Sequence, residues 1–436
     1  MKSLLNKIYP YVFLLGMVGA FSACESLLDA ENPNQLTEDS LSDPRAFNAM
    51  VNGAERTVMQ AYANIGLPYS VVTDEVVWIG SRDAWAQLDF GSVEDINNEF
   101  TDAAWFFVTE ARYWCDEVIK RGEAFEQVTI NQNDLARAYL SGATIYVMIA
   151  DMYDDFVVAS DKLEAGAPVG PGNMSSLYDK AIGYLEKANA IKSGDFAILS
   201  MMARAHQAKG IWGKLNPVNT SSPLVASSAA VSFANQALAA AGGEDAYYKL
   251  TVEPTARPGG LAFASEINSR LEQRLSNVYI INDGPRVASP GDGDPYNTIA
   301  LYDPIDNIPD PALNKIVVDF ATSFLDYDFI MSSTREMYLI LAEDALANNK
   351  TDEFTNAINK LRALDGLTPY SGQIPAIDLL KHSRRVNLYL QGRRLSDHYR
   401  FNDPSVYWLP GRATVTNPGT FFAITISEIQ ANPNIN

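Results

Sequence analysis

The amino-acid sequence predicts a mainly α-helical protein, in which tetratricopeptide-like helix pairs form a scaffold and a long loop-rich insertion carries a few short strands. Three observations support this fold class. Apolar residues recur at spacings of three and four through most of the chain. Segments 177–210 and 334–365 each have the pattern of a helix-turn-helix unit of about 34 residues. Between them, residues 243–330 are rich in Pro, Gly and Asp, which favour turns.

The N-terminal segment has the pattern of an export leader. Two lysines precede an apolar run at residues 9–21, and small residues stand immediately before Cys24. We therefore expect a signal peptide over residues 1–23 and a lipid anchor on Cys24, because two or three acyl chains give stable membrane attachment. An ordinary signal peptide that leaves Cys24 unmodified is the alternative. The polar residues 24–41 would then form a lipidated tether.

The remaining residues, 42–436, are expected to form a single domain. Polar capping residues and Pro44 in the first turn begin the first helix, and the Gly-Leu-Pro sequence at 66–68 is expected to end it. Trp105 and Trp114 stand at helical spacing on a later helix and are interpreted as core residues. The helical scaffold units are predicted near residues 42–66, 101–156, 174–240 and 333–400.

The loop-rich insertion at 243–330 is the predicted binding region, because loops of this length in compact chains are usually functional or disordered. Short strands are expected at 278–281 and 315–318, where β-branched residues cluster. An Asp-Gly-Asp sequence at 292–294 resembles part of a calcium loop. The Pro-Tyr pair that follows it breaks the alternation of ligands, so a turn is expected there.

Composition and charge exclude several classes of function. The chain has 436 residues, of which 47% are hydrophobic and 11% aromatic, so it can bury a large core. A net charge of −20 disfavours nucleic acid and anionic membrane surfaces as partners. After the leader, no uninterrupted apolar run is long enough to span a membrane. Cys24 and Cys115 are the only cysteines, so a lipidated Cys24 leaves Cys115 without a disulfide partner.

No catalytic pattern is present in the sequence. It contains neither a G-x-S-x-G nucleophile elbow nor a G-x-x-x-x-G-K-[ST] phosphate loop. The three histidines are scattered, and none has metal-ligand spacing. With 53 acidic residues, the presence of a pair of carboxylates carries no information about glycoside hydrolysis. The sequence therefore predicts a protein that is not an enzyme and uses no metal or cofactor.

Aromatic residues among charged residues indicate a carbohydrate-binding loop. A flat Trp or Tyr covers the apolar C–H face of a sugar ring, while Asp or Arg beside it bonds the hydroxyl groups. The alternative for the two tryptophans of this loop is that both are core residues. The first-choice candidates are Tyr69, Asp74, Trp78, Arg82, Asp83 and Trp85, and the second choice is Tyr296, Tyr302 and Tyr327.

Four motifs, taken in order, carry a family resemblance. They are the start at 24–29 (CESLLD), the helix at 334–346 (TREMYLILAEDAL), the segment at 359–367 (NKLRALDGL) and the close at 422–434 (FAITISEIQANPN). In order and spacing they resemble the SusD/RagB family, the nutrient-binding outer-membrane lipoproteins of Bacteroidetes-type bacteria. The resemblance implies a lipid anchor in the cell outer membrane, facing outward. It also implies capture of an oligosaccharide or similar nutrient, and a TonB-dependent, SusC-like transporter as partner.

A fifth motif departs from the family pattern. Segment 384–400 keeps the family's Gly392, Arg394, Asp397 and Arg400. Three positions that are acidic in the family are Arg384, Asn387 and Gln391 here, and the family's tryptophan is Leu395. We interpret this segment as a structural motif whose buried ion pairs are rearranged. The rival to nutrient binding is an interaction scaffold, because stacked helix pairs commonly hold a peptide or protein partner in a groove.

Overall fold

The computed structural model describes residues 41–159, 164–252, 262–281 and 299–435. The chain divides into two compact units, residues 1–46 and 47–436. In the first unit, the described part is a short 3₁₀ turn, η1 (Pro44–Ala46), where the Asp43 carboxylate accepts a bond from the backbone N–H of Arg45. Cys24, Tyr296 and the Asp-Gly-Asp sequence at 292–294 lie outside the described residues.

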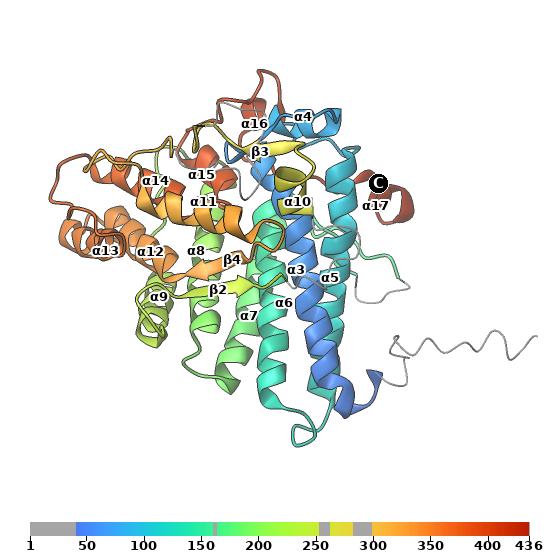
Figure 1. Cartoon of the computed structure of the whole chain (residues 1–436). Helices are drawn as coiled ribbons and strands as arrows, with labels where there is room; N and C mark the ends of the chain where they lie inside the picture. Colours follow the sequence, from blue (N-terminus) through green and yellow to red (C-terminus); the bar gives the residue numbers. More distant parts are fainter. Residues whose placement is uncertain (1–40, 160–163, 253–261, 282–298, 436) are drawn as a thin grey trace, which may run out of the picture. The chain divides into compact units, whose positions relative to one another are not determined.

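Five long helices stand side by side in the second unit and form a row (Figure 1). Each helix packs on the next, because each presents a stripe of apolar side chains at three- and four-residue spacing. Three of them begin at an Asn or Asp whose side chain accepts backbone N–H bonds from the first turn. In order along the row they are α5 (Glu99–Ala124), α3 (Phe47–Val72), α6 (Gln132–Met152), α7 (Ser175–Ile191) and α8 (Phe196–Leu215).

A second group of helices continues from α8 through α9 (Ser228–Ala240) to α12 (Thr334–Ala347). One apolar cluster joins α8, α9 and α12, and another joins α12 to α13 (Thr351–Ala363) and α14 (Ala376–Asn387). The pairs α7–α8 and α12–α13 are the two predicted helix-turn-helix units, so this part of the prediction is confirmed. The remaining helical elements are α4 (Asp83–Asp89), η2 (Pro171–Asn173), α10 (Ala262–Asn268), α11 (Pro311–Ser323), α15 (Arg394–Arg400), α16 (Ala413–Thr416) and α17 (Ile426–Ala431).

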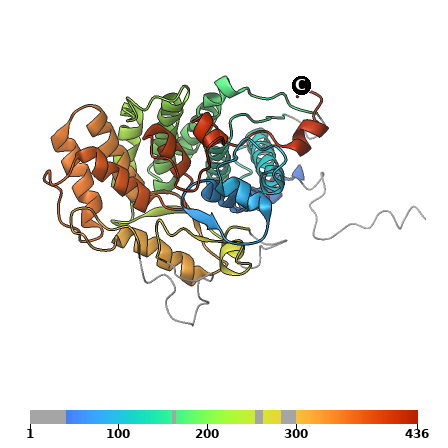
Figure 2. The same cartoon turned by 90° about the horizontal axis from the view of Figure 1, so that it is seen from above.

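Two small antiparallel sheets are formed between segments far apart in the chain. β1 (Val76–Trp78) pairs with β3 (Gln273–Leu275), and β2 (Tyr247–Leu250) pairs with β4 (Phe329–Ser333) across a register shift. Seen from above, the segments around residues 247–333, yellow to orange, lie along one face of the helix row (Figure 2).

The two predicted strands are wrong. Residues 315–318 belong to helix α11, which has a strong start signal: Asp310 caps it with two backbone N–H bonds, and Pro311 occupies its first position. Within 278–281 only Ile280 forms a bridge, with Ile299. The insertion is therefore more regular than a continuous loop, since it contributes α10, α11, β2, β3 and the start of β4.

The first helix also ends later than predicted. α3 continues through Pro68 to Val72. A proline inside a helix removes one backbone hydrogen bond and costs about 3 kcal/mol. Every residue from Ile65 to Val72 is buried, and burial of several large apolar side chains at about 1.5–3 kcal/mol each outweighs that cost. Packing against the rest of the unit therefore overrides local propensity here.

The motif at 384–400 forms a buried ion-pair network, as interpreted from the sequence. Arg400, which is fully buried, donates to both oxygens of Glu343 and to Asp397 Oδ1. Arg384 donates to both oxygens of Asp397 at 2.9 and 3.1 Å and to Glu343 at 3.3 Å. Burial raises the pKa of Asp397, but the two arginines outweigh it and lower the pKa to about 2. This carboxylate is therefore ionised in the folded protein at neutral pH.

The substituted positions of the motif also take part in buried bonding. Asn387 accepts a bond from Arg335, whose guanidinium also pairs with Asp245 and Asp365. Gln391 donates to the backbone carbonyl of Asn387. These contacts join α12 to α14, and they join α12 to Asp245, which precedes it in the sequence, and to Asp365, which follows it. They support the interpretation that the ion pairs are rearranged. Among the described residues, no helix is both long and apolar enough to cross a membrane.

Candidate functional site

Three of the predicted binding residues are core side chains, and for them the prediction is wrong. Tyr69, Trp85 and Tyr327 are each at most 2% exposed. Trp85 stacks on Phe100 with ring centroids 3.6 Å apart, and Tyr327 packs edge-on against Phe320 and Phe329. Rings enclosed in this way offer no face to a sugar. The alternative that the tryptophans are core residues is confirmed for Trp85.

Asp74 is also buried, and it has a structural role. Arg394 donates to both of its oxygens at 2.8 Å, and Arg385 and Tyr279 add bonds at 2.7 and 2.9 Å. Burial raises the pKa of Asp74, but the bonds from Arg394 and the nearby His398 hold it well below its ordinary value. Its oxygens are therefore occupied by cations and are not offered to a ligand, so this prediction is wrong as well.

Trp78, Arg82 and Asp83 lie together at the connection between β1 and α4. Trp78 ends β1 and is half-buried, and Asp83 is exposed in the first turn of α4. The Arg82 guanidinium lies 4.4 Å from the ring centroid of Phe100 and pairs with Glu99 at 2.9 Å. Phe100 is itself half-buried. We call Trp78, Arg82, Asp83 and Phe100 the β1–α4 surface.

Polar groups with unused bonding capacity lie beneath this surface. Within the described part of the chain, Trp78 Nε1 and both amide atoms of Gln273, its partner across the sheet, have no hydrogen-bond partner. Asp89 accepts a weak bond from the Trp78 backbone N–H at 3.4 Å, and its other oxygen is unpartnered in the same residues. Burial raises the pKa of Asp89 to about 7. A polar ligand or water that reached these groups would satisfy them.

Tyr302 is exposed, at 46%, but lies in another segment. It forms a bridge with Pro309 in the loop before α11. Among the described residues, no hydrogen bond or ring contact joins it to Trp78, Arg82 or Asp83. The structure therefore brings together three of the predicted residues and leaves Tyr302 as a separate candidate.

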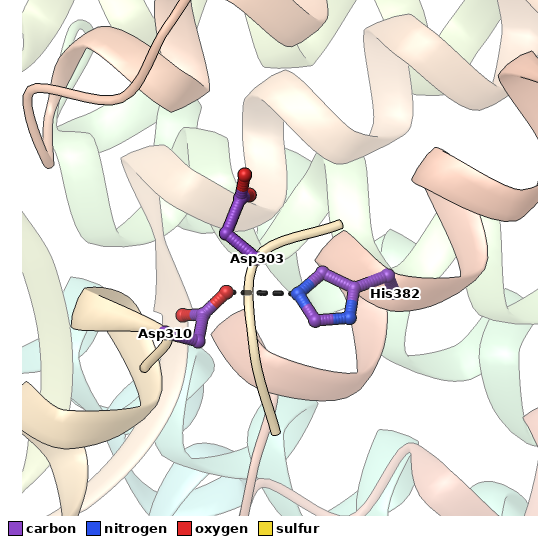
Figure 3. A group of neighbouring side chains, drawn as sticks. All are labelled: Asp303, Asp310 and His382. Atoms are coloured by element: carbon purple, nitrogen blue, oxygen red, sulfur yellow. Dashed lines mark hydrogen bonds and ion pairs between the residues drawn. The ribbon is translucent and has the colours of Figure 1, made fainter. Parts of the chain in front are cut away.

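Asp303, Asp310 and His382 form a cluster in which one possible ligand atom of each lies within 4.8 Å of the others (Figure 3). The bonding argues against a metal centre. Arg362 donates to both oxygens of Asp303 at 2.7 and 3.0 Å and so supplies the positive charge that a cation would bring. Asp310 Oδ1 caps α11, and its Oδ2 bonds His382 at 2.8 Å. We interpret this cluster as an ion-paired joint between α11, α13 and α14.

Two hollows that the sequence did not predict lie beside α3, and Arg56 lines both. One, of about 630 Å³, lies between α3, α6 and β2, and the other, of about 460 Å³, lies between α3 and α5. We call the two hollows the α3 groove. Trp114, interpreted from the sequence as core, lines the second hollow and is half-buried, whereas Trp105 is core as predicted. Glu110 lies four residues before Trp114 and Glu117 lies three residues after it, so the three side chains share one side of the helix. The two charged residues indicate that this side faces outward.

Comparison with known proteins identifies the fold. No protein-family model matches the sequence, and no curated protein matches it either. Solved structures do match. A SusD superfamily protein from Bacteroides fragilis has a TM-score of 0.63 and 12% identity, over 90% of this chain and 99% of that one. A SusD-like carbohydrate binding protein from Bacteroides vulgatus has a TM-score of 0.54 and 15% identity, over 82% and 83% of the two chains. A laminarin binding SusD-like protein has a TM-score of 0.56 and 13% identity, over 89% and 98%.

The chain thus has the SusD-like fold. The resemblance seen in the sequence motifs is confirmed at the level of fold, and so is the mainly α-helical class with its helix pairs.

Proposed function

We propose that this protein is a SusD-like, cell-surface binding lipoprotein that captures an oligosaccharide or a similar nutrient. The observation that carries this proposal is the shared fold, which extends over about nine-tenths of the chain and includes proteins named for carbohydrate and laminarin binding. Fold alone does not fix function, so the chemistry of a site must support it. The β1–α4 surface gives that support, with an aromatic ring, a guanidinium and a carboxylate within six consecutive positions, 78–83.

The number of available aromatic rings limits the affinity. Stacking one sugar face on one ring buries enough apolar surface for about 2 kcal/mol. Because Trp85 is buried, Trp78 is the only tryptophan that this surface offers, with Phe100 partly exposed beside it. We therefore expect a dissociation constant nearer millimolar than micromolar for a short oligosaccharide.

The test is a glycan array, followed by calorimetry of any oligosaccharide that binds, with the wild-type protein and Trp78→Ala. Loss of the stacking ring should weaken binding by about tenfold or more. Phe106→Ala is the matched control, because Phe106 is an exposed aromatic, at 63%, on α5 outside this surface. If Trp78→Ala binds a proven ligand as the wild type does, the β1–α4 surface is not the site. In that case Tyr302→Ala is the next variant to measure.

The same proposal includes the lipid anchor, the outer-membrane location and delivery of the ligand to a TonB-dependent, SusC-like transporter. They are supported by the leader, by the position of Cys24 and by the SusD-like fold. Cys24→Ala should release folded protein from the membrane fraction. Persistent membrane association of that variant, in cells that lack the transporter, would contradict the anchor.

The α3 groove favours the second candidate, an interaction scaffold. Its two hollows offer Trp114 on one side and the ion pair of Arg137 with Glu55 on the other, a mixture suited to an extended peptide segment of a protein partner. Purification of the native membrane complex with wild-type and Trp114→Ala protein tests this candidate. A partner retained by the wild type and lost with Trp114→Ala, while glycan binding is unchanged, supports the scaffold. A partner retained equally by both proteins counts against this groove.

A further inference from the structure

The hollow between α3 and α5, one of the two that form the α3 groove, has a distinct chemistry. The two helices lie side by side (Figure 1), and the hollow between them has a volume of about 460 Å³. That is many times the roughly 10–15 Å³ that one water molecule needs, so a large side chain can enter it. Its walls come from Gly53, Arg56, Thr57 and Gln60 of α3 and from Glu110, Tyr113 and Trp114 of α5. We call it the α3–α5 hollow.

Trp114 presents an indole ring that is held at one edge and open at the hollow. A Cβ built at Gly53 would lie 3.2 Å from Trp114 Nε1, so the glycine lets the indole approach the α3 backbone closely. The neighbouring Tyr113 already has a cation beside it, because the Arg112 guanidinium lies 5.8 Å from its ring centroid. Within residues 41–159, 164–252, 262–281 and 299–435, no ring or cation lies against Trp114. Its half-buried ring is therefore available to a partner.

Glu110 is the carboxylate of the hollow, and it lacks a cationic partner. It is exposed and stands one helical turn before Trp114 on the same side of α5. Glu117, which follows Trp114, accepts a bond from Arg121 at 2.7 Å. Among the residues that the structure describes, no hydrogen bond or ion pair engages the Glu110 side chain. An uncovered indole and an unpaired carboxylate thus stand side by side, and both attract positive charge.

An arginine side chain matches this pair of groups. Its planar guanidinium stacks on an aromatic face, and its N–H groups bond a carboxylate in a fixed fork. Lysine would satisfy the charge of Glu110 but has no plane to stack on Trp114. Gln60, half-buried on the opposite wall, carries an amide oxygen that can accept a remaining N–H. A sugar ring would also stack on Trp114, but the charge of Glu110 favours a cation.

The surrounding charges locate the cation in this hollow. The chain as a whole has a net charge of −20, which attracts a basic partner from a distance. The other hollow of the α3 groove has three basic residues, Arg56, Arg137 and Lys249, against Glu55 alone, and so disfavours a cation. Arg56 also lines the α3–α5 hollow, where it is exposed and has an interaction of its own. Its like charge opposes an incoming cation, so its removal should strengthen binding.

We propose that the α3–α5 hollow binds an arginine side chain, presented by an extended segment of a protein partner, between the Trp114 ring and the Glu110 carboxylate. The inference rests on the interaction scaffold proposed above, in that it names the group which the partner inserts. It does not depend on glycan capture, because the hollow shares no residue with the β1–α4 surface.

The probes are three capped five-residue peptides, each with two glycines on either side of a central arginine, lysine or citrulline. Citrulline has nearly the shape of arginine without its charge. Binding to the wild-type protein is followed by tryptophan fluorescence and saturation-transfer NMR at low ionic strength, where surface charges are least screened. We expect the arginine peptide to bind in the millimolar range, about fivefold more tightly than the citrulline peptide, with the lysine peptide between them.

Three sets of variants separate the contributions of charge and ring. Glu110→Gln should weaken binding of the arginine peptide about threefold and leave the citrulline peptide unchanged, because it removes only the charge. Trp114→Phe keeps a weaker ring and Trp114→Leu removes it, so affinity should fall in that order, by about threefold or more for leucine. Arg56→Gln should strengthen binding of the arginine peptide about twofold. Added salt should reduce the effect of Glu110→Gln and spare that of Trp114→Leu.

Glu186→Gln is the matched control, because Glu186 is exposed on α7, away from the hollow. It should bind all three peptides as the wild type does. The inference is refuted if the arginine peptide does not bind, if it binds no more tightly than the citrulline peptide, or if Glu110→Gln leaves its affinity unchanged. Tighter binding of glucosamine than of the arginine peptide would also overturn it, since the hollow would then serve an amino sugar. If Trp114→Leu unfolds, Trp114→Phe and Glu110→Gln decide.

The outcomes separate this inference from the scaffold on which it rests. If a partner in the native membrane complex depends on Trp114 while the arginine and citrulline peptides bind equally, the scaffold stands and the arginine site fails. If the arginine peptide binds through Glu110 and Trp114 while no partner depends on Trp114, recognition of arginine stands and the scaffold fails.

Discussion

Replacing Arg400 with methionine tests the role of the buried ion-pair network in stability. The guanidinium is fully buried and donates to Glu343, Asp397 and the backbone carbonyl of Pro223. Methionine fills similar space with no charge. In Arg400→Met, Asp397 keeps two bonds from Arg384, but Glu343 keeps only a 3.3 Å contact with that arginine and the 3.0 Å bond from the Val225 N–H. One buried carboxylate is thereby left largely uncompensated.

Breaking a buried pair in this way typically costs about 3–5 kcal/mol of unfolding free energy, because the remaining charge stays desolvated. Urea denaturation at neutral pH, with the unfolding slope held in common, measures the loss. The double variant Arg400→Met/Glu343→Gln removes the uncompensated charge and keeps an acceptor for the Val225 N–H. It should recover at least half of the loss.

Lys209→Met is the control, because Lys209 pairs with Asp179 at the surface, where both side chains are at least 40% exposed. It should change stability by no more than about 0.5 kcal/mol. The reasoning is refuted if Arg400→Met loses less than about 1 kcal/mol, or if the double variant is as unstable as the single one.

Two further predictions concern Glu75 and Gly122. Burial raises the pKa of Glu75 to about 8, so this carboxyl group stays protonated in the folded state at a pH where it ionises in the unfolded state. The stability of the folded state that depends on Glu75 is therefore complete below about pH 4.5 and decreases as the pH rises to 8. Glu75→Gln cannot ionise and should therefore gain stability over the wild type across this range, by up to about 4–5 kcal/mol at pH 8 in urea denaturation; equal stability of the two proteins at pH 5 and pH 8 would contradict the raised pKa. A Cβ at Gly122 would lie 2.6 Å from Phe47 Cζ and 2.9 Å from Leu135 Cδ1, so Gly122→Ala should lower stability by about 1–3 kcal/mol despite the better helix propensity of alanine. Gly183→Ala on α7 meets nothing within 4 Å and should raise stability by up to about 1 kcal/mol, and a gain at both positions would show that Gly122 is not tightly packed.

Local sequence patterns predicted the helices well. The pairs α7–α8 and α12–α13 follow from apolar periodicity. The charged residues of 384–400 indicated buried ion pairs, because so many arginines in one structural motif need partners. The end of α3 could not be predicted in this way. Whether a helix passes through Pro68 depends on how much surface the following turn buries, which only the tertiary structure determines.

The candidate site was harder to predict, because burial of an aromatic ring depends on distant partners. Trp78 and Trp85 stand in similar sequence surroundings, yet Trp85 is enclosed by Phe100 from another helix. The helical spacing of Trp114 predicts a core residue, although Glu110 and Glu117, at helical spacing from it, indicate that its face of the helix is exposed.

The buried arginines also set the order in which the chain can complete its fold. Arg394 pairs with Asp74, which precedes it by 320 residues, and Arg393 pairs with Glu336. Contacts of such long range form late, since a large loop must close before they contribute any stability. Asp74 and Glu336 therefore stay without these partners until residues 384–400 have been synthesised. For the exported chain proposed above, this part of the ion-pair network therefore cannot form until nearly the whole length of the chain is available.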